Sequence, residues 1–139
     1  MTTIAYHHKD KQIAVDSRVS SGTFINTDNH KKVYKVGDCI LFLSGGLSDI
    51  YTFISEFPEI RTAGSCAGFC IDNKLVYNIS VDKEGRLHKS LVSYNDAEGS
   101  GYAFAIAAMD FGKSAKEAIK YTATRDNGTG GRIRVYNVI

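Results

Sequence analysis

The second residue of the chain, Thr2, is the first side chain whose position suggests chemistry. Methionine aminopeptidase removes an initiator methionine that precedes a small residue, and loss of Met1 would leave Thr2 as the N-terminus. Such a residue holds a hydroxyl nucleophile beside its own α-amine, which titrates near ~7.7 to 8.0 and therefore suits a base at neutral pH. Taken alone, Thr2 is better explained as an ordinary strand residue, because many proteins begin with Met-Thr.

Five later blocks hold the side chains that such a nucleophile needs. They are Val15-Asp16-Ser17-Arg18, Lys31-Lys32-Val33, Ser44-Gly45-Gly46 through Asp49, Gly99-Ser100-Gly101, and Arg125-Asp126 followed by Thr129-Gly130-Gly131. With Thr2-Thr3-Ile4, their order and approximate spacing resemble the proteasome β-type subunits and the bacterial proteasome-like ATP-dependent peptidase, which are N-terminal-nucleophile hydrolases. The resemblance extends over nearly the whole chain except roughly residues 61–95.

The resemblance implies a role for each matching residue. Thr2 is the nucleophile, Lys32 lowers the proton affinity of its hydroxyl and amine, and Asp16 keeps that lysine charged. The backbone N–H of Gly45 is the oxyanion donor. Ser100 and Asp126 hold the threonine amine and its water, with Thr129 at a position where the family usually has serine.

Each of these residues also has a simpler interpretation. Asp16 ends an apolar strand, Lys32 is a solvated strand lysine, and Gly45-Gly46 is a strand-to-helix turn. Ser100 is a helix N-cap and Asp126 a turn residue.

A substrate site is implied by the same resemblance. Ser20 and the segment Gly45-Gly46-Leu47 match the two edges that hold an extended peptide by backbone pairing. The pocket for the residue before the cut is matched by Val19, His30, Tyr34, Leu43 and Leu47. This composition favours an apolar side chain, although packing in the core explains each residue equally well.

The periodicity of the sequence predicts the elements that position these residues. Extended runs at Thr2–His8 and Gln12–Ser20 form a hairpin around Lys9-Asp10-Lys11, and Lys32–Val36 with Cys39–Ser44 form another. A helix over Leu47–Phe57 ends before Pro58, and strands follow between Ala67 and Tyr94.

Helices and a final strand complete the expected order. Tyr102–Phe111 is apolar nearly all round, which predicts a buried helix, and Ser114 with Glu117 forms a capping box that begins the next helix. A strand with Ile133 and Val135 follows Gly130-Gly131. We therefore expect one antiparallel α+β domain over residues 1–139, the four-layer α-β-β-α sandwich of the resembled family with one helical layer reduced.

Composition limits the remaining classes of function. With 17 basic and 15 acidic residues the net charge is +2, too balanced for a protein that binds nucleic acid through phosphates. The longest apolar runs, Cys39–Leu43 and Ala103–Met109, are too short to cross a membrane, and the N-terminus lacks a secretory signal, which predicts a cytoplasmic protein. The cysteines lack metal-knuckle spacing, so we expect free thiols, no metal and no cofactor.

The resemblance leaves three classes of function open. A threonine-type peptide hydrolase would act on peptides or unfolded proteins, as a homo-oligomer with a ring as one arrangement and an ATP-dependent unfoldase as one partner. The second class is an inactive subunit of the same fold that binds or scaffolds. The third is an amidase that acts on small molecules, because a fold does not fix its substrate.

Overall fold

The computed structural model describes residues 2–139, so Met1 and its predicted removal lie outside the described residues. Two antiparallel sheets carry most of the structure. The first has the strand order β10 (Asp96–Gly99), β1 (Thr3–His7), β2 (Gln12–Val15), β11 (Arg134–Asn137). The second has the order β5 (Val33–Val36), β6 (Cys39–Gly45), β7 (Cys66–Asp72), β8 (Leu75–Val81), β9 (Leu87–Leu91).

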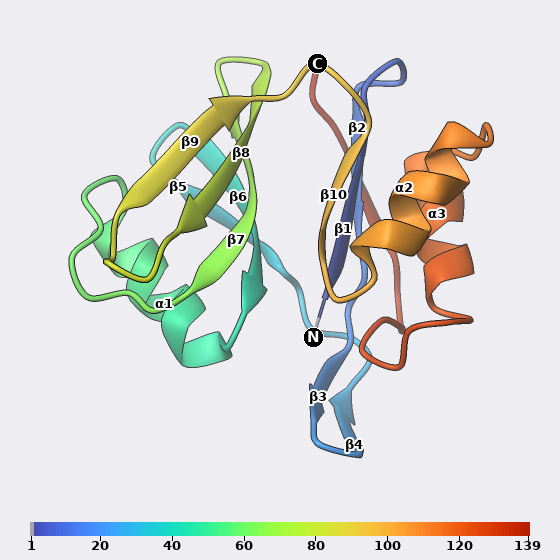
Figure 1. The fold of residues 1–139 in the computed structure, drawn as a ribbon, viewed down its shortest axis with the longest axis horizontal. Helices are drawn as coiled ribbons and strands as arrows, with labels where there is room; N and C mark the ends of the chain where they lie inside the picture. The colour runs from blue at the N-terminus through green and yellow to red at the C-terminus, as the bar shows by residue number, and fades with distance from the viewer. Residues whose placement is uncertain (1) are drawn as a thin grey trace.

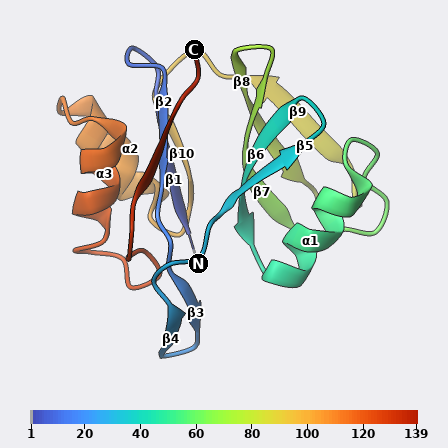
Figure 2. The same cartoon turned by 180° about the vertical axis from the view of Figure 1, so that it is seen from behind.

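Three helices cover the outer faces of the sheets. Helix α1 (Leu47–Glu56) lies on the five-stranded sheet, whereas α2 (Tyr102–Asp110) and α3 (Ala115–Thr122) lie together on the four-stranded sheet (Figures 1 and 2). The layers are therefore α, β, β and α, with one helix on one side and two on the other. This arrangement confirms the predicted α+β sandwich and its reduced helical layer.

Alternation along the strands creates the three layers of core. On β1, Ile4 and Tyr6 point into the core between the sheets, while Ala5 faces the helices. The same period on β6 sends Phe42 between the sheets, and Leu41 and Leu43 toward α1. Alternate residues of a strand therefore pack in different core layers. A shift by one residue would exchange the two faces, so this alternation fixes the register of both sheets.

Helix α3 begins as the sequence predicts, because the Ser114 hydroxyl accepts from the Glu117 N–H and the Glu117 carboxylate accepts from the Ser114 N–H. The helix predicted at Tyr102–Phe111 forms as α2, but the prediction that it is buried is wrong, because one of its faces is exposed. Ala105 and Ala108 pack in one cluster with the alanines of β1, β2 and β10, whereas Phe104 is 41% exposed and Phe111 89% exposed. The same cluster holds the larger Met109 and Ile119.

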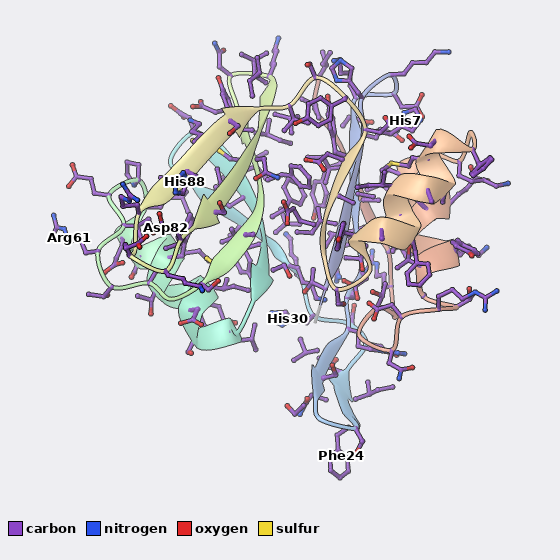
Figure 3. The ribbon with its side chains drawn as sticks, viewed as in Figure 1. His7, Phe24, His30, Arg61, Asp82 and His88 are labelled. Atoms are coloured by element: carbon purple, nitrogen blue, oxygen red, sulfur yellow. The ribbon has the colours of Figure 1, made fainter. Side chains whose placement is uncertain are left out.

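The strand predicted over Gln12–Ser20 is also wrong, because β2 stops at Val15. The chain leaves the sheet there and forms a separate hairpin from β3 (Val19–Ser21) and β4 (Phe24–Thr27), which turns at Gly22 with φ +59°. This hairpin extends away from the sandwich with Phe24 near its end (Figure 3). Within residues 2–139, no helix has the length and apolar character needed to cross a membrane.

Candidate active site

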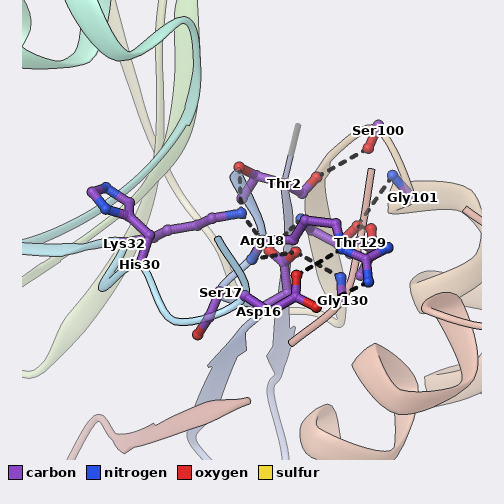
Figure 4. Close-up of polar contacts among 12 residues, drawn as sticks. Thr2, Asp16, Ser17, Arg18, His30, Lys32, Ser100, Gly101, Thr129 and Gly130 are labelled. Atoms are coloured by element: carbon purple, nitrogen blue, oxygen red, sulfur yellow. Dashed lines mark hydrogen bonds and ion pairs between the residues drawn. The ribbon is translucent and has the colours of Figure 1, made fainter. Parts of the chain in front are cut away.

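Thr2 lies just before β1 and lines a pocket of the protein. Its carbonyl oxygen accepts the backbone N–H of Ser100 at 2.8 Å, with the Ser100 hydroxyl 3.4 Å away. Figure 4 shows Lys32 approaching Thr2 from one side, with Ser100 and Gly101 on the other. The start of β1 is therefore held between the loop that follows β10 and the segment that enters β5.

A buried ion pair adjoins the Thr2 hydroxyl. The Lys32 Nζ lies 2.8 Å from Asp16 Oδ1 and donates to Thr2 Oγ1 at 3.0 Å. Burial lowers the pKa of Lys32, and the charge and hydrogen bond of Asp16 oppose that shift. An ammonium group at this distance stabilises negative charge that develops on the threonine oxygen.

The Asp16 carboxylate is fully buried and holds three backbone segments as well as the lysine. Oδ1 accepts from the Thr3 N–H at 3.2 Å, and Oδ2 accepts from the N–H groups of Gly130 at 3.0 Å and Arg18 at 3.4 Å. Both oxygens are thus supplied with donors. These contacts explain why β2 stops at Val15, because the chain turns so that Asp16 points inward instead of continuing the ladder.

A chain of hydroxyl groups lies behind Thr2 and ends at Asp126. Oδ2 of this carboxylate accepts from the Ser100 and Thr129 hydroxyls, each at 2.6 Å. Since the Thr129 proton is used there, the Thr3 hydroxyl donates in the 2.6 Å contact between Thr3 and Thr129. Thr3 Oγ1 in turn accepts the Gly101 N–H at 3.2 Å.

The pKa of Asp126 reflects this chain. Burial raises the pKa, but the hydrogen bonds from Ser100, Thr129 and the Gly128 N–H outweigh burial and leave the pKa below its usual value. The carboxylate is therefore ionised at neutral pH and fixes the direction of every hydroxyl that leads to it.

The glycines on either side of Ser100 allow this close approach. A Cβ on Gly99, which has φ +105°, would lie 1.9 Å from the Thr2 carbonyl oxygen. A Cβ on Gly101 would lie 2.2 Å from Thr122 Cγ2 and 2.5 Å from Thr3 Oγ1. The loop needs glycine at both positions for Ser100 to reach the Thr2 backbone.

A pocket of about 490 Å³ opens in front of Thr2. Of the residues predicted as catalytic, Thr2, Lys32, Gly45 and Ser100 line it, whereas Asp16, Asp126 and Thr129 make their contacts behind its wall. Every residue predicted to bind substrate lines the pocket: Val19, Ser20, His30, Tyr34, Leu43, Gly46 and Leu47. The structure thus brings both predicted sets together around one opening.

The detailed positions differ from some of the simpler interpretations. Lys32 is 4% exposed, so it is no solvated strand lysine, and Gly101 instead of Ser100 is the N-cap of α2. Gly45, with φ +145°, ends β6, and Gly46 is the N-cap of α1, which confirms the predicted strand-to-helix turn. That turn faces the pocket as well.

Sequence reasoning missed several residues of the site, among them Thr3 and Arg18; Ser21, Ser44 and Ile50 also line the pocket. Thr3 links Gly101 to Thr129 by hydrogen bonds, and Arg18 lines the pocket while it pairs with Asp28 at 2.8 Å. Both stand inside the blocks that carry the family resemblance, next to residues with assigned roles. Their side-chain chemistry gives no further signal, because threonine and arginine are ordinary at strand ends.

No metal site is evident in the part of the chain that the structure describes. No group of three or more His, Cys, Asp or Glu side chains there is close enough to hold an ion. Cys66 and Cys70 are buried free thiols, and burial raises the pKa of Cys66 to about 11 and that of Cys70 to about 12. These thiols are packing groups of the core and lie outside the pocket lining.

Comparisons with known proteins agree on the fold. No protein-family model matches the sequence, and no curated protein matches it significantly. HslV from Trypanosoma brucei superposes with a TM-score of 0.74 at 18% identity, covering 97% of this chain and 98% of that one. BPH from Thiobacillus denitrificans in complex with epoxomicin gives a TM-score of 0.69 at 16% identity over 97% of each chain.

A further structure of the Thiobacillus denitrificans BPH superposes with a TM-score of 0.68 at 16% identity, covering 97% of this chain and 96% of that one. At these identities the likeness establishes the fold. The chain has the fold of HslV over nearly its whole length, as the resemblance in the sequence indicated.

Proposed function

We propose that the chain is a threonine peptidase of the N-terminal-nucleophile type, with Thr2 as the nucleophile once Met1 has been removed. The observation that carries the proposal is the 3.0 Å contact of Lys32 Nζ with the Thr2 hydroxyl, made while the lysine is paired with the fully buried Asp16. A buried lysine is costly, and its burial beside a hydroxyl in a pocket is typical of a catalytic group.

The proposed reaction divides hydrolysis into two steps. The freed α-amine takes the hydroxyl proton, the threonine oxygen attacks the peptide carbonyl, and the Gly45 N–H stabilises the oxyanion. The protonated amine then gives its proton to the leaving amine, which leaves an ester on Thr2. Water, activated by the same amine, hydrolyses that ester and frees the hydroxyl. The Ser100 and Asp126 contacts would hold the amine in place.

The test uses a peptide epoxyketone, which requires both the amine and the hydroxyl of an N-terminal threonine. We expect the intact mass to show loss of Met1 and a single adduct. Thr2→Ser keeps a hydroxyl and should also form the adduct, whereas Thr2→Ala should not. The structural neighbour bound to epoxomicin makes this class of inhibitor a natural choice.

Three results would contradict the peptidase. Loss of Met1 with no adduct in the unmodified sequence would favour the inactive subunit that binds or scaffolds. Retention of Met1 on protein isolated from its native host would do the same, because an acylated Thr2 nitrogen is an amide without a basic lone pair. Hydrolysis of small amides with no cleavage of peptides would favour the amidase.

Self-association belongs to the same proposal. A pocket of about 590 Å³ between α2 and α3 has Ala107, Ala108 and Tyr121 in its lining, beside the 89% exposed Phe111. Exposed apolar surface of this kind is often an interface. We expect light scattering at micromolar concentration to show an oligomer, and Phe111→Ser to weaken it. A clean monomer would contradict this part of the proposal.

A further inference from the structure

Two buried polar atoms in the pocket lining have no hydrogen-bond partner among residues 2–139. They are Nε2 of His30 and the hydroxyl oxygen of Tyr34. A buried polar group without a partner carries its full cost of desolvation. Among the described residues, no other buried side-chain nitrogen or oxygen of the lining lacks a hydrogen-bond partner. These two polar atoms are not expected in a purely apolar pocket.

The position of the two side chains follows from the backbone. His30 and Lys32 lie on the segment that leads into β5, Tyr34 lies on β5 itself, and all three side chains line the pocket. The middle residue reaches the Thr2 hydroxyl. His30 lies beside Lys32 in Figure 4, and its place between the sandwich and the β3–β4 hairpin is seen in Figure 3. The two unpartnered groups therefore lie along the same wall as the nucleophile.

The rest of the lining combines aliphatic side chains with small hydroxyl residues and two cations. Val19, Leu43, Leu47 and Ile50 supply aliphatic surface. Burial, and secondarily Tyr51, raise the pKa of Tyr34 to about 12, so its phenol is neutral at pH 7. Lys32 and Arg18 also line the pocket, but each is already paired with a carboxylate, Asp16 and Asp28 respectively, which suits a neutral side chain.

We propose that this pocket selects a neutral side chain with an aliphatic stem and an amide tip, glutamine above all, for the residue before the scissile bond. The inference rests on the proposed peptidase and replaces the apolar preference expected from the sequence. An amide has both a donor and an acceptor, which suits one phenol and one imidazole nitrogen. A purely apolar side chain would leave both groups unpartnered.

Selection requires a small movement of two rings. Neither atom is reached by solvent, so the rings of His30 and Tyr34 must turn slightly before a substrate group pairs with them. Pairing two buried polar groups favours that turn, since each gains a hydrogen bond that it otherwise lacks. The preference therefore depends on the terminal group of the substrate side chain, because the aliphatic residues of the pocket accept the methylene groups of many side chains.

The test compares two peptide substrates that differ only at the residue before the cut, one with glutamine and one with methionine. These side chains have similar length, and only glutamine forms strong hydrogen bonds. We expect kcat/KM to favour glutamine by roughly fivefold to thirtyfold, the value of one to two hydrogen bonds. Tyr34→Phe removes one of the two partners and should lower the ratio about fivefold.

A control substitution separates the hydroxyl from the ring packing. Tyr51 meets Tyr34 edge to face with ring centroids 6.4 Å apart, but it does not line the pocket. Tyr51→Phe should therefore keep the preference for glutamine. Equal or faster cleavage after methionine, or an unchanged ratio in Tyr34→Phe, would overturn the inference.

A binding measurement keeps this inference distinct from the peptidase proposal. If neither substrate is cleaved, the peptidase fails, and NMR titration with acetylated tripeptide acids ending in glutamine or methionine decides the pocket. Tighter binding of the glutamine peptide that is weakened in Tyr34→Phe would support the inference. Equal binding of the two peptides would refute it.

Discussion

Asp16→Asn is expected to be the most damaging conservative change at the site. The carboxylate accepts on both oxygens, from Lys32 and the Thr3 N–H on Oδ1 and from the N–H groups of Gly130 and Arg18 on Oδ2. An asparagine amide has only one acceptor oxygen. In either orientation its NH₂ group faces two donors, and the buried Lys32 ammonium loses its counter-charge.

The expected cost follows from that count. Removing one partner of a buried ion pair costs about 3 kcal/mol or more, because the remaining charge is uncompensated. Lys32→Met is milder, at about 2 kcal/mol, since the Asp16 carboxylate keeps its three backbone donors and methionine fills the space of the lysine stem. Combining both changes removes both charges, so the double variant should be less destabilised than the sum by about 1–2 kcal/mol.

Urea unfolding at pH 7, followed by circular dichroism, measures all three variants against the unmodified protein. Intact masses must first show the same state of Met1 in each sample. We expect Asp16→Asn to lose more stability than Lys32→Met, and both to lose hydrolysis. If Lys32→Met costs as much as Asp16→Asn, or if the two changes add within about 0.5 kcal/mol, the electrostatic reasoning is wrong.

Three further outcomes are expected. Gly99→Ala should cost more than about 2 kcal/mol and abolish adduct formation, whereas Gly112→Ala, with a similar positive φ and open space, should cost only about 1 kcal/mol of strain. Thr129→Val should lose about 1–3 kcal/mol by removing one of the hydroxyl donors to Asp126 and leaving Ser100 as the other, while Thr129→Ser keeps both. Because burial lowers the pKa of Lys32 below 10.5, the folded state binds fewer protons, and stability should rise with pH as it approaches 10.5.

Each of these predictions compares a variant with a matched control. Equal losses in the two glycine variants would show that space near Thr2 is not limiting. A Thr129→Val protein as stable as Thr129→Ser would show that the Thr129 hydroxyl does not contribute to stability. For the pH effect, denaturation at several pH values should show the rise in the unmodified protein and not in Lys32→Met; identical pH profiles would contradict the assignment.

Local rules were sufficient for much of the fold. The capping box at Ser114 and Glu117 depends on residues three positions apart, and strand β1 shows its two faces in consecutive residues, so both could be predicted from sequence. The two faces of α2 could not. Alanine and phenylalanine are both apolar in a periodicity argument, and only packing against the alanines of the sheet reveals that the aromatic rings remain outside.

The candidate site shows the same division. The types and order of Thr2, Asp16 and Lys32 point to the chemistry through a family resemblance, and the structure brings them within hydrogen-bonding distance. The end of β2 at Val15 was missed, because an inward turn at Asp16 is driven by donors on Gly130 and Arg18 that no local pattern reveals. The unpartnered Tyr34 hydroxyl is likewise a property of three-dimensional packing.

The hydrogen bonds around Thr2 also have a consequence for the order of events during synthesis. The Gly130 bond to Asp16 joins residues 114 positions apart, and the Thr129 bond to Thr3 joins residues 126 positions apart. A ribosome releases the N-terminal strands long before their partners exist. The hydrogen bonds of Asp16 and Thr3 with this loop therefore form only after the loop around Gly130 has emerged. If the proposed peptidase is correct, the growing chain carries its nucleophile without a working site until folding is complete.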